Sequence, residues 1–207
     1  MMFNFTEDWQ FTSRLYLENT LLENIRETKL LGTIITSDLK WQKNTHMLVC
    51  KSYKRMTILH KLSQFKATQK DMTTIYILYI RSILEQNCQV WHYSLTQDEQ
   101  YDLERVQKVA FRIILKEDYI SYQNALSVLD LQTLHQRRSL LCLRFARKCT
   151  KHPKVSSMFP LNQDKKHSLR PHETYYVQPA KTGRLLNSSI PQMQRALNKD
   201  ATSKQKH

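Results

Sequence analysis

The middle of the chain repeats apolar residues at a helical spacing. From Asn44 onward, Val49, Tyr53, Met56 and Leu59 recur every three or four positions, which places them on one face of an α-helix. The same spacing recurs in three later runs, which are Met72–Ile83, Leu103–Ile113 and Leu134–Phe145. In the last run Leu134, Leu141 and Phe145 form the expected core stripe. The pattern predicts a mainly α fold.

A threonine precedes each of these three later runs. Three positions after each threonine stands an acidic or amide residue. The pairs are Thr68 with Asp71, Thr96 with Glu99, and Thr133 with Gln136. In such a capping box, each side chain binds the exposed backbone N–H of the other residue. A shorter helix is expected at Ser121–Leu129. Pro153 should end the last long helix, because proline cannot continue a helical hydrogen-bond ladder.

The start of the chain has a different pattern. Residues 11–17 and 28–35 are rich in aromatic and β-branched residues, and Leu21, Leu22 and Ile25 lie between them. These short runs predict a small antiparallel β unit. We therefore divide the chain into a β unit at 1–38, a helical domain at 39–152 and a basic tail at 153–207.

The tail is expected to be largely disordered. Residues 161–189 mix His, Lys, Arg, Ser and Gln, with few apolar residues and no clear period. Ser189-Ile190-Pro191 is the one place in the tail where a helix start is expected, and this short helix would hold Met193 and Leu197.

The net charge of +14 is concentrated near the end of the chain. Residues 1–39 hold three Lys or Arg and six Asp or Glu, which gives −3. Residues 131–207 hold sixteen and three, which gives +13. A polyanion would be drawn to that end, and nucleic acid is the commonest polyanion partner. The alternative is a solvated tail that only keeps the protein soluble.

Several functional classes are excluded by composition. The two glycines, Gly32 and Gly183, are far apart, so the chain lacks the glycine-rich loops of dinucleotide, nucleotide and methyl-donor sites. No cofactor is expected. The most apolar run, Met72–Leu84, contains Arg81 and is too short to span a bilayer, so no membrane contact is expected. The dispersed cysteines and the absence of a secretory signal favour a nuclear or cytoplasmic protein with reduced thiols.

The stretch from Arg137 to Lys154 is the strongest candidate for direct binding chemistry, because it is cationic and contains no Asp or Glu. On a helix, Arg137, Arg144, Lys148 and Lys151 share one side. Without acidic partners these cations repel one another, and a phosphate backbone would relieve that repulsion. The candidate nucleic-acid-binding residues are Arg137, Arg138, Arg144, Arg147, Lys148 and Lys151. The alternative is a solvated helix.

No metal site is expected. Cys142, Cys149 and His152 could join Cys88 or His92 around zinc, but the spacing of the two helical cysteines is too wide for a zinc knuckle. Buried thiols are the better interpretation of these cysteines. Trp91 is expected to pack in the core and His92 to lie on the surface. Asp98 and Asp102 are expected on a solvated helix face.

Several segments together resemble a known family. They are Lys29–Ile35, Asp38–Trp41, Asn44-Thr45, Ile80–Glu85, Val90–His92, Leu103–Lys108 and Leu140–Cys149. In order and spacing they resemble the palm-to-thumb junction, thumb and C-terminal region of non-LTR (LINE-type) retrotransposon reverse transcriptases, which are RNA-directed DNA polymerases. Phe3-Asn4-Phe5 is similar to the strand after the catalytic centre. The resemblance covers most of residues 28–152.

The resemblance implies a chain without its catalytic centre. These polymerases hold two Mg²⁺ ions with palm aspartates, usually in a Tyr-x-Asp-Asp turn. No Asp-Asp pair occurs here, so no catalytic residue is expected. The expected chain is an inactive C-terminal fragment from a truncated reading frame, with residual sequence-independent binding. Its implied partners are the RNA or DNA backbone and the polymerase of an intact element.

The resemblance also assigns a role to one turn. Leu31, Gly32 and Thr33 match the primer grip, which holds the 3′ end of the growing strand. The plainer alternative is a β-turn in which glycine permits a tight backbone path.

Two other functional classes stay open. Residues 30–62 also resemble a segment catalogued as the N-terminal region of AlkB-type tRNA hydroxylase/methyltransferase proteins. The iron chemistry of such enzymes needs a His-x-Asp pair, and no histidine here has Asp or Glu two positions later. The third class is a helical protein-interaction module.

Overall fold

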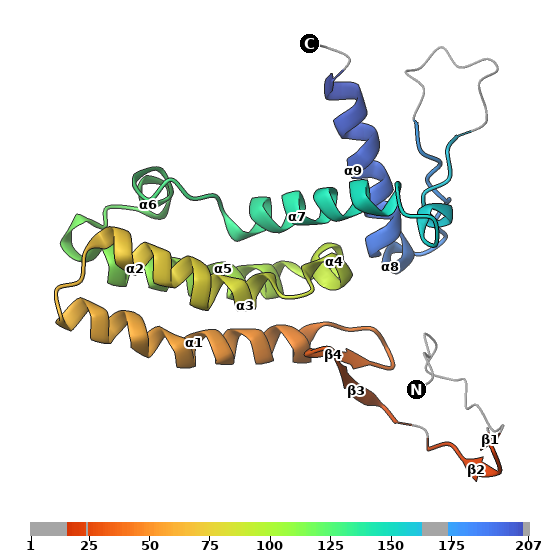
Figure 1. The fold of residues 1–207 in the computed structure, drawn as a ribbon, viewed down its shortest axis with the longest axis horizontal. Helices are drawn as coiled ribbons and strands as arrows, with labels where there is room; N and C mark the ends of the chain where they lie inside the picture. Colours follow the sequence, from red (N-terminus) through yellow and green to blue (C-terminus); the bar gives the residue numbers. More distant parts are fainter. Residues whose placement is uncertain (1–15, 24, 163–173, 205–207) are drawn as a thin grey trace.

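The computed structural model describes residues 16–23, 25–162 and 174–204. It is mainly helical, with two small antiparallel sheets at the N-terminal end, which confirms the predicted fold class (Figure 1). Of the segments predicted from sequence, Phe3-Asn4-Phe5, residues 11–15 and residues 163–173 lie outside the described residues.

The N-terminal β unit consists of two hairpins. The first pairs β1 (Tyr16–Leu17) with β2 (Thr20–Leu21), and the second pairs β3 (Glu27–Leu30) with β4 (Thr33–Thr36). All four residues of the first hairpin's strands are exposed, so that hairpin contributes nothing to the core. β4 is more buried than β3 and contacts the first long helix.

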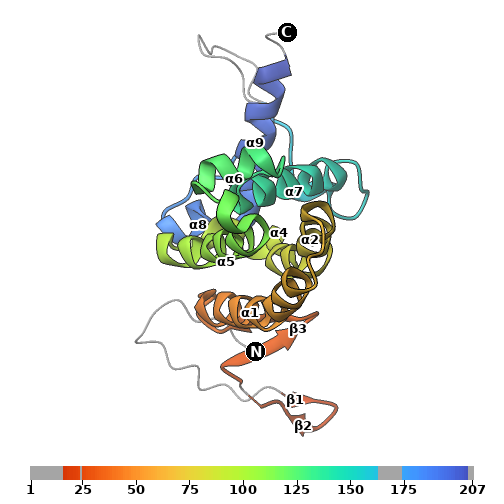
Figure 2. The ribbon, with the colours of Figure 1, turned by 90° about the vertical axis from the view of Figure 1, so that its left-hand side faces the viewer.

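The helices form three layers. The outer layer is α1 (Gln42–Gln64), shown in orange in Figure 1. The middle layer consists of α5 (Gln97–Leu115) and a broken helix, which begins after the turn that ends α1. That broken helix consists of α2 (Gln69–Ile75), the π-helical turn η1 (Tyr76–Arg81), α3 (Ser82–Glu85) and α4 (Cys88–Trp91). α7 (Leu134–Cys149) covers the side of the middle layer opposite α1, with α6 (Tyr122–Val128) beside its start (Figures 1 and 2).

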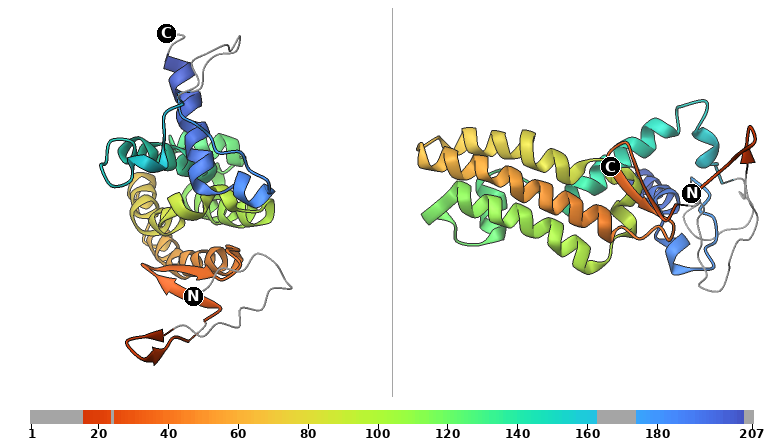
Figure 3. Two further views of the ribbon diagram at one scale, coloured as in Figure 1. Left: turned by 90° about the vertical axis from the view of Figure 1, so that its right-hand side faces the viewer. Right: turned by 90° about the horizontal axis from the view of Figure 1, so that it is seen from below.

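Short turns link these layers. They are the 3-10 turns η2 (His92–Ser94), η3 (Lys116–Asp118) and η4 (Ser156–Met158). Seen from below, α1 lies along the groove between α2–α3 and α5 (Figure 3). Leu48, Met56 and Leu59 of α1 are buried there, which forms one half of the core.

The predicted helix starts are confirmed in detail. Thr96 with Glu99 and Thr133 with Gln136 form complete capping boxes at the starts of α5 and α7. At the start of α2 the Thr68 side chain accepts a bond from the Asp71 N–H as predicted. The Asp71 carboxylate instead accepts a bond from the Thr68 hydroxyl, at 2.6 Å.

After residue 153 the structure differs from the predicted disordered tail. Residues 174–204 include α8 (Gly183–Leu186) and α9 (Ser189–Lys204), and α9 packs against α7. Met193 and Leu197 are buried, so the predicted helix at Ser189 is confirmed and is longer than expected. Asn198 anchors the approach to this helix by binding both the backbone N–H and the carbonyl of Tyr175, at 2.8 and 2.9 Å.

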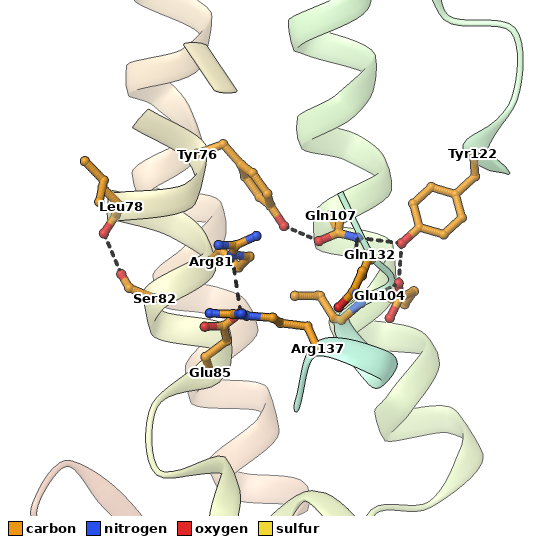
Figure 4. Close-up of polar contacts among 11 residues, drawn as sticks. Tyr76, Leu78, Arg81, Ser82, Glu85, Glu104, Gln107, Tyr122, Gln132 and Arg137 are labelled. Atoms are coloured by element: carbon orange, nitrogen blue, oxygen red, sulfur yellow. Dashed lines mark hydrogen bonds and ion pairs between the residues drawn. The ribbon is translucent and has the colours of Figure 1, made fainter. Parts of the chain in front are cut away.

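A buried amide connects the middle layer to α6 and α7. Gln107, which is fully buried on α5, accepts a hydrogen bond from the Tyr76 hydroxyl at 2.5 Å (Figure 4). Its Nε2 donates to the Tyr122 hydroxyl at 2.7 Å and to the Gln132 carbonyl at 3.0 Å. One side chain therefore ties η1, α6 and the segment before α7 to α5.

Glu104, one turn before Gln107, extends this network. Its carboxylate accepts bonds from the Tyr122 hydroxyl and from the Leu134 N–H, the latter at 3.0 Å. The Leu134 N–H is one of the unpaired donors of the first turn of α7, where a negative charge is favourable. Burial raises the pKa of Tyr76 and of Tyr122 well above the ordinary range, so both hydroxyls stay protonated donors.

We predict that Gln107→Ala lowers the free energy of unfolding by about 3 kcal/mol, because it leaves buried hydroxyl and carbonyl groups unpaired and opens a cavity. Urea unfolding followed by circular dichroism measures this. The control is Arg105→Ala on the exposed face of the same helix, which should change stability by no more than about 0.5 kcal/mol.

A double-mutant cycle separates the network from simple loss of volume. The cost of Gln107→Leu with Tyr76→Phe should be less than the sum of the single costs, since both partners of one hydrogen bond are removed together. Strict additivity, or equal effects of Gln107→Ala and Arg105→Ala, would contradict the role assigned to Gln107.

Candidate nucleic-acid interface

The inner face of α7 determines which of its cations can reach a ligand. Its buried residues face the middle layer and recur every three or four positions: Leu134, Arg138, Cys142, Ala146 and Cys149. The complete capping box at Thr133 and the bond to Glu104 fix the start of the helix. The opposite side of α7 and the turn that follows it therefore face solvent.

Two of the six predicted binding residues already have acidic partners. Arg137 Nε lies 3.1 Å from the carboxylate of Glu85, which also pairs with Arg81 at 3.3 Å (Figure 4). Arg147 pairs with Asp200 of α9 at 2.5 Å. The prediction that this stretch lacks acidic partners is wrong, because the partners come from elements distant in sequence.

Arg138 is not on the surface at all. It is fully buried, with its guanidinium over the Trp91 ring, 5.6 Å from the ring centre, and its Nε facing His92 Nδ1 at 3.4 Å. Its two terminal nitrogens have no hydrogen-bond partner among the described residues. Burial lowers its pKa below the ordinary value. Its assignment as a nucleic-acid contact is wrong, because phosphate cannot reach it.

The remaining three predicted residues lie on the outward side of α7 and in the turn that follows it. Arg144, Lys148 and Lys151 are exposed, and none forms an ion pair within the described part of the chain. Phe145 was expected in the core but is 44% exposed beside them, because the core-facing stripe runs through Cys142 and Ala146. We call Arg144, Lys148 and Lys151 the α7 face.

A second set of cations lies on α1, where the sequence prediction placed none. Residues 39–70 contain eight Lys or Arg and no Asp or Glu, and this uninterrupted run was the signal that could have revealed the set. In the structure Lys54 and Lys61 are exposed and Lys51 is partly exposed, on the side of α1 away from the core. We call these three residues the α1 face.

Two other cations of α1 are engaged within the protein. Lys43 pairs with Glu27 of β3. Arg55 stacks on the Tyr79 ring at 4.1 Å and donates to the Tyr79 carbonyl at 2.8 Å. None of Lys51, Lys54 and Lys61 has an ion pair among the residues described.

A serine–histidine pair at the buried side of α7 is not a nucleophilic site. His92 Nε2 lies 3.0 Å from Ser139 Oγ, while its Nδ1 accepts from Arg138. The proton of neutral His92 is therefore on Nε2 and points at the serine. Ser139 in turn donates to the His135 carbonyl at 2.9 Å. A general base must present a lone pair to the nucleophile, and here the direction is reversed.

Three of the cysteines and His92 are buried in the protein. Cys88, Cys142 and Cys149 are buried free thiols, as predicted, and Trp91 is fully buried as predicted. His92 was expected on the surface and is instead 2% exposed, because its ring packs against Ser139 and Arg138 of α7. Among the described residues, no three His, Cys, Asp or Glu side chains are grouped so as to hold a metal ion.

The turn assigned to a primer grip has a clear structural cause. Leu30 pairs with Thr33, so Leu31 and Gly32 form a two-residue loop in which both have positive φ. This is the geometry that hairpin twist favours. Asn87 donates to the Leu31 carbonyl at 3.0 Å and to the Thr33 hydroxyl at 2.8 Å. The φ of 83° at Gly32 favours glycine, whereas the nearest atom to a Cβ there would be Gln86 Nε2, the movable end of a side chain.

A large cleft of about 1160 Å³ lies apart from both cationic faces. Its walls come from β4, the start of α1, the first half of α5 and the chain between Ser157 and Gln194. Asp98 and Asp102 are exposed there, as predicted, and Lys40 and Arg184 also line it. Its mixed charge does not favour a polyanion.

Comparisons with known proteins add no relative. No protein-family model, no curated protein and no solved structure matches this chain. Within the described ranges, none of the helices has both the length and the apolar character needed to cross a bilayer.

We predict that His92 makes stability depend on acid pH. Burial and the charge of Arg138 lower the folded-state pKa of His92 from 6.5 to about 3. The unfolded chain therefore binds a proton as pH falls through about 6.5, while the folded chain does not until about pH 3. Between about pH 7.5 and about pH 5 this should remove roughly 2 kcal/mol of stability.

Urea unfolding at these two pH values, for the wild type and His92→Asn, measures the effect. The loss on acidification should be about 2 kcal/mol smaller in the variant, whatever its stability at neutral pH. Equal losses in both proteins would mean that His92 titrates normally.

Proposed function

We propose that this protein is a nucleic-acid-binding module that grips the phosphate backbone without reading sequence. The observation that carries the proposal is the α7 face: Arg144, Lys148 and Lys151 point to solvent and lack carboxylate partners in the described structure. Arg137 and Arg147, at the sides of α7, are paired with Glu85 and Asp200 and are therefore already neutralised within the protein.

The physics favours a polyanion on this face. Exposed cations that share one side of a helix repel one another, and phosphates relieve that repulsion while releasing condensed counterions. Such contacts position a strand without reading its bases. Phe145, which follows Arg144 in sequence, is 44% exposed, so an unpaired base can stack on its ring.

We further propose that the chain is an inactive C-terminal part of a non-LTR retrotransposon reverse transcriptase. The similar segments fall on β3–β4, η1–α3, α5 and α7, so a tight hairpin leads into a helical bundle. That order agrees with the palm-to-thumb order that the resemblance implies. The chain has no Asp-Asp pair, so we propose binding without polymerisation, in the nucleus or cytoplasm, with an intact element polymerase as a further partner.

We predict that the α7 face contributes about three phosphate contacts. Because α1 offers a second cationic face, the test uses a chain with Lys51, Lys54 and Lys61 already replaced by Gln. In that background, replacing Arg144, Lys148 and Lys151 with Gln should flatten the slope of log K against log salt by about 2.7 on duplex DNA, and by about 2 on a single strand. Fluorescence anisotropy with two unrelated sequences measures both.

The control removes an equal number of positive charges at other positions, in the chain that already lacks Lys51, Lys54 and Lys61. Lys29→Gln, Arg105→Gln and Lys199→Gln are exposed positions on three different elements and should change the slope little. Glutamine keeps helix propensity close to that of Lys and Arg, so circular dichroism should stay unchanged. A slope insensitive to the α7 substitutions would mean that this face is only solvated and would favour a protein-interaction module.

A further inference from the structure

The α1 and α7 faces lie on opposite sides of the molecule. α1 packs on α5 and α2–α3 from one side, and α7 packs on α4 and α5 from the other (Figures 1 and 2). Each helix buries its inner stripe in the middle layer, so each cationic set faces outward, away from the other. The whole middle layer separates them.

The α1 face is long enough to follow a strand by itself. Lys51 and Lys61 are ten residues apart on one continuous helix, which is about 15 Å at about 1.5 Å per residue. That length covers roughly four to five phosphates of one strand, which are about 3.4 Å apart along the duplex axis. Neither α1 nor α7 contains an Asp or Glu that would repel the strand.

One short duplex cannot occupy both faces. To reach the α1 face from the α7 face it would have to bend around the middle layer. A duplex of about 20 base pairs is far shorter than the persistence length of about 150 base pairs, so it behaves as a stiff rod. Occupation of both faces therefore requires two separate nucleic-acid segments.

We propose that one molecule of this protein bridges two nucleic-acid segments, one on the α1 face and one on the α7 face. The proposal rests on the nucleic-acid binding proposed above and extends it, since binding alone needs only one face. The occupant of both faces is a phosphate backbone, because these exposed cations have no carboxylate partner among the residues that the structure describes. Bridging would raise the local concentration of one strand near another.

Energy transfer between two duplexes of about 20 base pairs tests this, one with a donor dye and one with an acceptor. With wild-type protein, transfer should rise and then fall as protein is added, because excess protein places a separate molecule on each duplex. The single-face variants are Lys51→Gln, Lys54→Gln, Lys61→Gln for α1 and Arg144→Gln, Lys148→Gln, Lys151→Gln for α7. The control is Lys29→Gln, Arg105→Gln, Lys199→Gln.

Each single-face variant should still bind one duplex in an anisotropy assay but lose the energy transfer, whereas the control should keep it. Energy transfer that persists in the α1 variant would overturn the proposal. It would indicate that two copies of the protein self-associate and that each copy holds one duplex on its α7 face. An equal loss in the control would also overturn it, by showing that total charge matters and position does not. Wild-type binding without transfer refutes bridging alone, whereas no wild-type binding refutes the proposed function as well.

Discussion

The hydrogen bonds of one buried amide hold α6 and the approach to α7 in register with the middle layer. Gln107 sits at the centre of α5 and binds Tyr76, Tyr122 and the Gln132 carbonyl at once. These groups come from the broken helix, from α6 and from the segment that leads into α7. A shift of any of these elements along α5 would leave a buried polar group unpaired, at a cost of about 1–3 kcal/mol each. The adjacent Glu104 fixes the start of α7 in the same way.

This register determines which cations of α7 are paired or buried within the protein. With α7 held in place, Arg137 meets Glu85 and Arg138 lies under Trp91, while Arg147 meets Asp200 of α9. The carboxylates of the middle layer and of α9 therefore neutralise the cations at the sides of α7. Only cations that point fully away from the core are left for a partner. The same holds on α1, where Lys43 and Arg55 are engaged, whereas Lys51, Lys54 and Lys61 have no ion pair in the part of the chain that the structure describes.

Local sequence signals predicted the helices well. Thr96 and Thr133 start helices through capping boxes that need only four residues to recognise. The periodic run in α5 identified most of its core, whereas the run in α1 was half right: Met56 and Leu59 are buried, but Val49 is half-buried and Tyr53 is exposed. The helix start at Ser189-Ile190-Pro191 also predicted α9, although its length and packing on α7 depend on contacts such as Asn198 with Tyr175 that sequence spacing does not reveal.

The candidate site was predicted less well, because ion pairing is a tertiary property. Glu85 and Asp200 are each more than fifty residues from their α7 partners, so a search for nearby acids along the chain could not find them. Arg138 and Phe145 were misplaced because the inner stripe runs through Arg138, Cys142 and Ala146, one position away from the stripe of large apolar residues. The acid-free run at 39–70 was visible in the sequence, but the charge counts drew attention to residues 131–207 instead.

The central claim is that nucleic-acid phosphates contact the α1 face and the α7 face in preference to other exposed cations of the protein. Lysine acylation read by mass spectrometry, with and without a saturating short duplex, tests it directly on the unmodified protein. Lys51, Lys54, Lys61, Lys148 and Lys151 should become less reactive when duplex is present, while Lys29 and Lys199 keep their reactivity. Uniform protection of all these lysines, or protection confined to Lys29 and Lys199, would contradict the account.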